Sequence, residues 1–292
     1  ERLDIANNDL VALWRQMLVN WMFYVVDCCD LQRHSVAAAV YFLDVAILRE
    51  LCTTREEHQL AAATALQMAL KTVDTAVIKL DKLVKLGRGL FTEEDVATME
   101  MKIIMSLNWN LHPPTVYCYL RQFERLTPSE IGDPTREIID QATNVIAEEM
   151  VLDERYIRYC PSVQGLATIL VALDFVPDGC LPEEHRETYV SRLSTASRLD
   201  GDSPVLSRVI KKIYKSLKRT GKFQTLIEIS MTKTKSLDLA SQRVLENVEQ
   251  NNKAASNTSN NNNNNKASKN TDNEEQQRSP RDVTEKFSNF RI

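Results

Sequence analysis

The sequence is poor in glycine, with seven in 292 residues, and it has no long apolar run. An all-β fold needs glycine at many tight turns, and glycine-rich nucleotide sites need it where the backbone approaches phosphate. A membrane-spanning helix needs about 20 consecutive apolar residues, and the runs here are far shorter. These deficits argue against an all-β fold and a glycine-rich nucleotide site, and we expect no membrane partner.

The sequence also has no excess of basic residues and no residue spacing typical of metal ligands. The net charge is −4, so little positive charge is available to neutralise phosphates, and we expect no nucleic-acid partner. We interpret the basic run at 208–222 as the solvated face of a helix. The six cysteines lie mostly inside apolar runs without Cys-x-x-Cys or Cys/His spacing, as in reduced core residues of a nuclear or cytoplasmic protein. The four histidines are too dispersed for a metal site, and we expect no metal and no cofactor.

The sequence does contain helical periodicity throughout its first 230 residues. Between Leu10 and Val25 apolar residues recur at i, i+3, i+4 and i+7, and Asn-Asn-Asp at 7–9 supplies a start signal. The same periodicity predicts helices over 35–49, 55–70, 75–86 and 92–107. Thr92 and Asp95 have the spacing of a capping box, with Asp in place of the usual Glu. Two prolines then break the chain at 113–114.

After this break the pattern recurs. Helices are predicted over 115–126, 134–151, 161–174, 183–196 and 204–219. The stretch 58–71 is apolar or small on nearly every face, and 161–174 repeats that character roughly 100 residues later. We therefore predict an all-α fold of two tandem five-helix bundles, over 1–112 and 113–230. Residues 231–292, rich in asparagine, serine and charge, are predicted to form a mostly disordered tail.

The segment "LWRQMLVNWM", residues 13–22, is unusually rich in large apolar side chains. On a helical wheel the apolar arc covers roughly half the circumference, whereas a core-facing stripe needs little more than about 100°. Trp14, Met17 and Trp21 share one part of that arc. Two interpretations remain open: a core helix with neighbours on both sides, which periodicity alone favours, or a helix that serves both a core and a docking patch.

Several motifs, in the right order, resemble the cyclin family. "RQMLVNWMFYVVDCCDLQRHSVAAAVYFLD" is similar to the opening of a cyclin box, and "HQLAAATALQMALK" to its buried third helix. "FTEEDVATMEMKIIMSLNWNLHPPTVYCYL" resembles the fifth helix and the start of the second box. The resemblance covers residues 10–120 well and 121–225 more weakly. It implies two cyclin folds in tandem, no catalytic site, and a cyclin-dependent protein kinase as partner.

The resemblance also implies which residues contact the kinase. Lys71 and Glu100 match the paired charges that bind kinase backbone, which would help to hold the kinase's mobile helix in its active position. The matching apolar and acidic contacts are Met68, Asp74, Ile104, Trp109 and Leu111. Without the resemblance, the residues favour a plainer interpretation, in which Lys71 complements a helix dipole and Glu100 lies on a solvated face.

Two further sets of residues match cyclin positions. Trp14, Met17, Trp21 and Gln59 fall on the family's substrate-docking patch, which receives short Arg-x-Leu peptides. Tyr24 stands where an acidic residue is common, which puts recognition of the arginine in doubt, so core-only packing remains the alternative. Arg15 and Asp44 match a buried ion pair between the first two helices, where loss of one partner would strand a charge. The alternative for this pair is two exposed charges.

The leading hypothesis is a regulatory subunit that binds and activates a cyclin-dependent serine/threonine protein kinase in cell-cycle control. A second hypothesis is an interaction module with the cyclin fold that binds transcription machinery instead of a kinase. A third, an enzyme with an unrelated helical fold, has no nucleophile–base pair or phosphate loop to support it. Because fold does not determine function, the choice depends on the matched sites.

Overall fold

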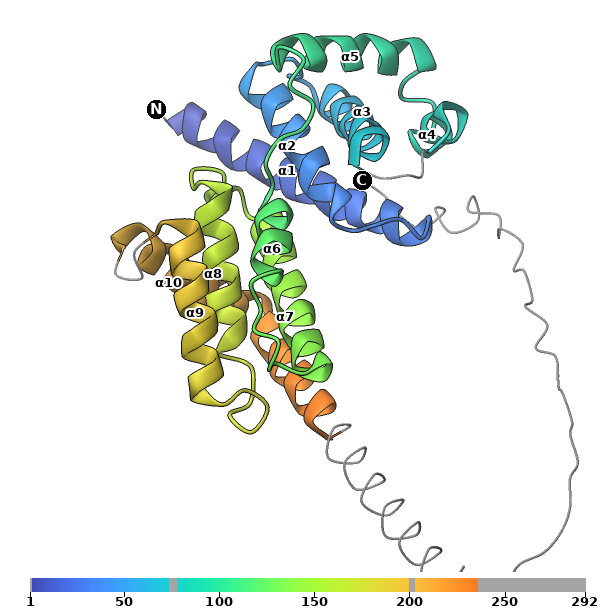
Figure 1. Cartoon of the computed structure of the whole chain (residues 1–292). Coiled ribbons are helices and arrows are strands. Elements are labelled where there is room, and N and C mark those ends of the chain that lie inside the picture. Colours follow the sequence, from blue (N-terminus) through green and yellow to red (C-terminus); the bar gives the residue numbers. More distant parts are fainter. Residues whose placement is uncertain (1, 74–77, 200–202, 236–292) are drawn as a thin grey trace, which may run out of the picture.

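A computed structural model describes residues 2–73, 78–199 and 203–235 of the chain, and within these ranges it is all-helical, as predicted. The helices are α1 (Arg2–Cys28), α2 (Ser35–Leu48), α3 (Arg55–Val73), α4 (Leu80–Leu86), α5 (Glu93–Ser106), α6 (Val116–Glu124), α7 (Asp133–Leu152), η1 (Glu154–Tyr156), α8 (Pro161–Leu173), α9 (Glu183–Ser197) and α10 (Pro204–Thr220). Residues 222–235 are also helical. Figure 1 shows α1 lying between α2–α5 and the remaining helices.

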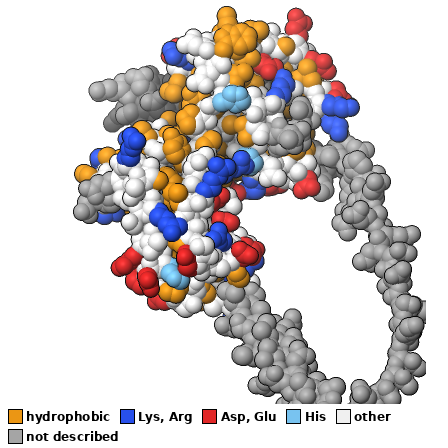
Figure 2. Space-filling view, in the orientation of Figure 1, with side chains coloured by type: hydrophobic (Ala, Val, Ile, Leu, Met, Phe, Trp, Pro, Cys, Tyr) orange, Lys and Arg blue, Asp and Glu red, His pale blue; other side chains and the backbone are white. Residues whose placement is uncertain are grey.

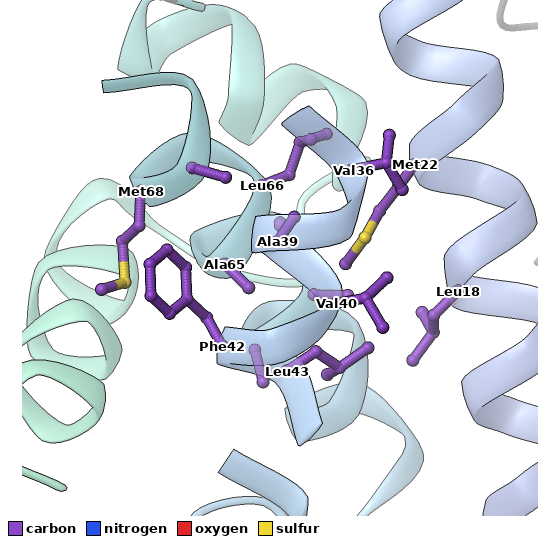
Figure 3. Close-up of a cluster of buried hydrophobic side chains, with 14 of the residues drawn as sticks. Leu18, Met22, Val36, Ala39, Val40, Phe42, Leu43, Ala65, Leu66 and Met68 are labelled. Atoms are coloured by element: carbon purple, nitrogen blue, oxygen red, sulfur yellow. The ribbon is translucent and has the colours of Figure 1, made fainter. Parts of the chain in front are cut away.

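The first group of helices, α1 to α5, surrounds α3. Residues 61–70 of α3 are all buried, and six of those ten positions are alanine or threonine, which lets α2 and α5 approach closely. In Figure 3, Val40 of α2 lies beside Leu18 of α1, while Phe42 turns the other way toward Met68 of α3. The helix that the sequence predicts to be buried all round is therefore the centre of this core.

The second group, α6 to α10, has its own buried cluster around α8, which contacts α6, α7, α9 and α10. Gly165 makes the contact with α6 possible, because a Cβ atom there would lie only 2.9 Å from Cβ of Tyr119. Thus α8 has the central position in its group that α3 has in the first. The boundaries at 112 and 230 stay a prediction, and the helix over 222–235 runs across the second of them.

The helix ends agree with the sequence where side-chain capping decides them. At α5, the Thr92 hydroxyl accepts from the Asp95 backbone N–H and the Asp95 side chain accepts from the Thr92 backbone N–H, which confirms the capping box. The start signal at 7–9 is wrong, because α1 begins at Arg2 and passes through it. Asn and Asp lower helix propensity by only about 0.7 kcal/mol per residue, which a continuing helix tolerates.

The cysteines correct another expectation. Cys52 is buried, but Cys118 and Cys160 are exposed and the other three are half-buried, so most are not core residues. An apolar neighbourhood in the sequence does not fix which face of a helix the residue occupies. All six thiols are unpaired. No helix in the described ranges has both the length and the apolar character to cross a bilayer. The expectation for residues 236–292 lies outside the described residues.

Candidate functional site

The Arg15–Asp44 ion pair that the resemblance implies is present and nearly buried. Arg15 is 5% exposed, and its Nε and Nη2 donate to the two Asp44 carboxylate oxygens at 2.6 and 3.0 Å. Burial raises the pKa of Asp44, and the guanidinium opposes that change. Arg15 Nη1 also donates to the carbonyls of Val151 and Leu152, at 3.3 and 3.2 Å. The pair therefore ties α1 not only to α2 but also to the end of α7, which the sequence did not indicate.

Lys71 and Glu100 meet on an accessible edge of the first group. Lys71 ends α3 and Glu100 lies on α5, and Lys71 Nζ donates to both Glu100 carboxylate oxygens at 2.9 and 3.0 Å. Their side chains are 40% and 24% exposed. Because the two charges face each other across two helices, they form one paired polar feature rather than separate solvated charges.

Apolar side chains surround this edge over the C-terminal half of α5, where Figure 2 shows them gathered at the surface. Trp109 is 65% exposed, and Met101 and Met105 are 51% and 60% exposed. The two methionines were not singled out from the sequence, although their i, i+4 spacing places them on one face of α5, outside its buried stripe. Together they form an uncovered apolar surface next to the charged pair.

The remaining residues matched to kinase contacts divide between core and surface. Ile104 and Leu111 are half-buried and pack against the first core. Met68 is 2% exposed and belongs to that core, so it presents almost no surface of its own. Asp74 lies outside the described residues.

The backbone at Trp109 is unusual. Asn108 and Trp109 have φ values of 48° and 64°, in the left-handed region. Asparagine is tolerated there, but a bulky aromatic residue is a rare outlier that costs about 1–2 kcal/mol. Such strain, kept at an exposed side chain, is typical of residues that a functional surface requires.

A hollow on the other side of the first group, here called the apolar pocket, has a volume of about 180 Å³. It is lined by Leu13, Trp14, Met17, Leu18, Arg55, His58 and Gln59. Three of the four residues matched to a docking patch thus lie together. Trp21 does not line the pocket, because it is 6% exposed and packs in the first core. One helix therefore serves both a core and an open pocket.

The described residues contain no group of three or more His, Cys, Asp or Glu side chains placed to hold a metal ion. The surfaces described above consist of one charged pair, exposed apolar side chains and an open hollow. Their chemistry suits the binding of another protein.

Comparison with known proteins assigns part of the chain to a family. Residues 5–112 match the family model for the cyclin N-terminal domain. These residues form a cyclin N-terminal domain. The X-ray structure of a viral cyclin from herpesvirus saimiri has the same fold, with a TM-score of 0.57 at 14% identity over 71% of this chain and 85% of that chain.

Plant cyclins are among the related sequences. Cyclin-B2-2 of Oryza sativa subsp. indica is 24% identical over 58% of this chain and 38% of its own length. Cyclin-A3-2 of Arabidopsis thaliana is 22% identical over 77% of this chain and 59% of its own length. The chain therefore covers less than two thirds of the length of these relatives. Every residue of the charged pair, the exposed apolar surface and the apolar pocket lies within the matched cyclin domain.

Proposed function

We propose that the chain is a regulatory subunit that binds and activates a cyclin-dependent serine/threonine protein kinase in cell-cycle control. The observation that carries this proposal is the Lys71–Glu100 pair on an accessible edge, beside the exposed Trp109. The likeness to plant A- and B-type cyclins supports a regulatory rather than an enzymatic role.

The physical basis is selection of one kinase conformation. A kinase is active only when its mobile helix places a glutamate against the ATP-site lysine. A rigid helical edge that binds the active position more tightly than the others shifts the equilibrium toward it. Lys71 offers donors and Glu100 acceptors for kinase backbone groups, and Trp109, Met101 and Met105 add apolar area around them.

The test is recovery of kinase activity from the source cells, with the full chain as bait. We expect Lys71→Ala/Glu100→Ala to recover at least tenfold less activity, because hydrogen bonds to charged groups contribute about 1.5–3 kcal/mol each. The matched control is Asp81→Ala/Lys85→Ala, which removes an exposed pair with a 3.9 Å separation on α4. If the folded chain recovers no kinase, the proposal fails and an interaction module with another partner replaces it.

We also propose that the apolar pocket receives short docking peptides of kinase substrates, because Trp14, Met17 and Gln59 line it together. A nuclear or cytoplasmic location belongs to the same proposal. Six unpaired thiols favour a reducing compartment.

A further inference from the structure

A second hollow shares Leu13 with the apolar pocket. This second hollow, here called the polar pocket, has a volume of about 490 Å³. It is lined by Ala12, Leu13, Gln16, Asn20, Glu149, Leu152, Asp153, Glu154, Arg155, Arg219, Thr220 and Lys222. Its walls therefore come from α1, from the end of α7 and η1, and from the end of α10 and the start of the helix over 222–235. Leu13 belongs to both pockets and is 52% exposed, so it forms an accessible apolar ridge between them.

The two pockets lie on either side of α1. The width of this helix therefore sets how long a bound peptide must be to fill both pockets. A helix with its side chains is about 10–12 Å across, and an extended peptide advances about 3.3 Å per residue. A segment that crosses α1 over Leu13 thus needs about three or four residues between the two pockets. Figure 1 shows α1 passing between the two groups of helices, so such a segment would contact both.

Most acidic side chains of the polar pocket are already bonded to other side chains of the protein. Glu149 is 5% exposed and accepts a hydrogen bond from the Ser216 hydroxyl at 2.7 Å. The Asp153 side chain is 7% exposed and lies between Arg155, whose Nε is 2.8 Å away, and Arg219, 3.5 Å away. Burial opposes the ionisation of Asp153, but the hydrogen bonds and charge of Arg155 and the charge of Arg219 outweigh it and lower its pKa.

The cations of the polar pocket reach solvent. The Arg155 and Arg219 side chains are 40% and 55% exposed, and the single Asp153 carboxylate neutralises only one of the two. Lys222 adds another positive charge, and Glu154 is an exposed negative charge. Counting the nearly buried Glu149 and Asp153, three acidic and three basic side chains line this pocket, but those that reach solvent are mostly cations.

The residues that line the apolar pocket include no acidic side chain. Arg55 is its one charged lining residue. His58 is 3% exposed, and its Nδ1 lies 2.7 Å from the Thr54 carbonyl oxygen, so it is turned inward. A peptide that fills both pockets thus passes Arg55 at one end and Arg219 and Lys222 at the other.

We propose that the two pockets form one docking groove for an extended acidic peptide segment. This inference rests on the proposed docking of substrate peptides. An apolar side chain of the segment fills the apolar pocket, and an aspartate or glutamate about three or four residues away binds beside Arg219 and Lys222. The charge preference is opposite to that of the Arg-x-Leu peptides that the family resemblance implies.

The test is fluorescence anisotropy of three labelled peptides with the full chain. Each carries the same leucine anchor, and the flanking residues are glutamate, glutamine or lysine. We expect the glutamate peptide to bind about tenfold more tightly than the glutamine peptide, with the lysine peptide weakest, and the difference to shrink with added salt. Equal or tighter binding of the lysine peptide overturns the proposal.

Charge-reversal variants locate the effect. Arg219→Glu/Lys222→Glu is expected to remove the preference for glutamate. Lys211→Glu/Lys215→Glu, two residues of α10 that do not line the pocket, is expected to retain it. Lys222→Glu alone repeats the test without removing a partner of Asp153. Trp14→Ala is expected to weaken all three peptides. An unchanged preference in the pocket variants, or unchanged binding in Trp14→Ala, overturns the groove.

Kinase recovery separates this inference from the proposed function. The Arg219→Glu/Lys222→Glu variant is expected to recover as much kinase as the unaltered chain, because the polar pocket excludes Lys71 and Glu100. If the chain recovers no kinase but the glutamate preference is found, the groove stands and the proposed function fails. If kinase is recovered but no peptide preference is found, the groove fails alone.

Discussion

At the scale of single residues, the most informative is Trp109, which is exposed in a strained backbone conformation. Glycine at a left-handed position relieves that strain. We therefore expect Trp109→Gly to leave the free energy of unfolding unchanged or to raise it by about 1 kcal/mol, since little buried area is lost. The same change is expected to reduce kinase recovery severalfold. Urea unfolding and the kinase pull-down measure the two effects.

The neighbouring Asn108 provides the control. Asn108→Gly removes a left-handed residue with φ of 48° but keeps the tryptophan side chain, so kinase recovery should not change. A large loss of stability in Trp109→Gly would mean that the side chain supports the fold and is not held for a partner.

The two tryptophans of α1 show what periodicity could and could not predict at this scale. Trp14 and Trp21 are seven positions apart, so a helical wheel places them on nearly the same face. Trp14 nevertheless lines a pocket, where its ring meets that of His58 at 5.3 Å, and Trp21 is in the core. A wheel gives the direction of a side chain, but it does not tell where along the axis the neighbouring helices begin and end.

At the scale of elements, the start of α3 has a capping box that was not predicted from the sequence. The Glu57 carboxylate accepts from the backbone N–H of Thr53 and Thr54 at 2.8 and 3.0 Å, and the Glu57 N–H donates to the Thr54 hydroxyl. Thr-x-x-Glu is the usual signature, so it could have been found. These backbone hydrogen bonds, with that of the Thr53 hydroxyl, lower the pKa of Glu57 to about 2.

This lowered pKa predicts a pH dependence of stability. A carboxyl with a lower pKa in the folded state stabilises the fold above its ordinary pKa of about 4.5, and that contribution is lost as the pH falls toward about 2. We expect Glu57→Gln to lower the free energy of unfolding at pH 7 by about 0.3–1 kcal/mol, because glutamine keeps an acceptor oxygen but loses the negative charge at the start of the helix. The difference from the unaltered chain should shrink between pH 4.5 and 2, as measured by urea unfolding.

Glu56, which is exposed and adjacent in the same turn, is the matched control. It makes none of the capping contacts of Glu57, so Glu56→Gln should change stability little at any pH. A pH-independent difference for Glu57→Gln would contradict the capping explanation.

Helix ends were predicted correctly where neighbouring side chains determine them, and a helix was missed where packing against distant residues stabilises it. The Thr92 capping box and the proline break could be predicted from the sequence, because the side chains that end a helix are adjacent to it. The helix over 222–235 was missed after Gly221, whose φ of 77° ends α10, although its buried and half-buried residues Phe223, Leu226 and Ser230 recur at helical spacing. Packing against the second core stabilises that helix, and its neighbours are distant in sequence.

At the scale of the whole molecule, arginines of the first group hold α7 of the second. Arg33 donates to both Glu148 carboxylate oxygens at 2.6 and 2.8 Å and also to Asp27 at 2.6 Å. Its guanidinium lies 4.7 Å from the ring centre of Phe23. With the bonds from Arg15 to the end of α7, these contacts reinforce a junction at which the two cores also touch, because Ala37 of α2 belongs to the second core and Val151 of α7 packs against both. We infer that the junction makes the two groups unfold together.

The three tryptophans allow this coupling to be measured, because all of them precede residue 112 and report only on the first group. In the unaltered chain, unfolding followed by tryptophan fluorescence and by far-ultraviolet circular dichroism should coincide. We expect Arg33→Ala/Glu148→Ala to weaken the junction by about 1–2 kcal/mol, since Arg33 is partly solvated, and to separate the two curves. Glu137→Ala removes an ion pair to Lys233 that does not involve the first group, so its curves should stay together. Coincident curves in the double variant would mean that the packing of α1 against α7, and not these charges, couples the two groups.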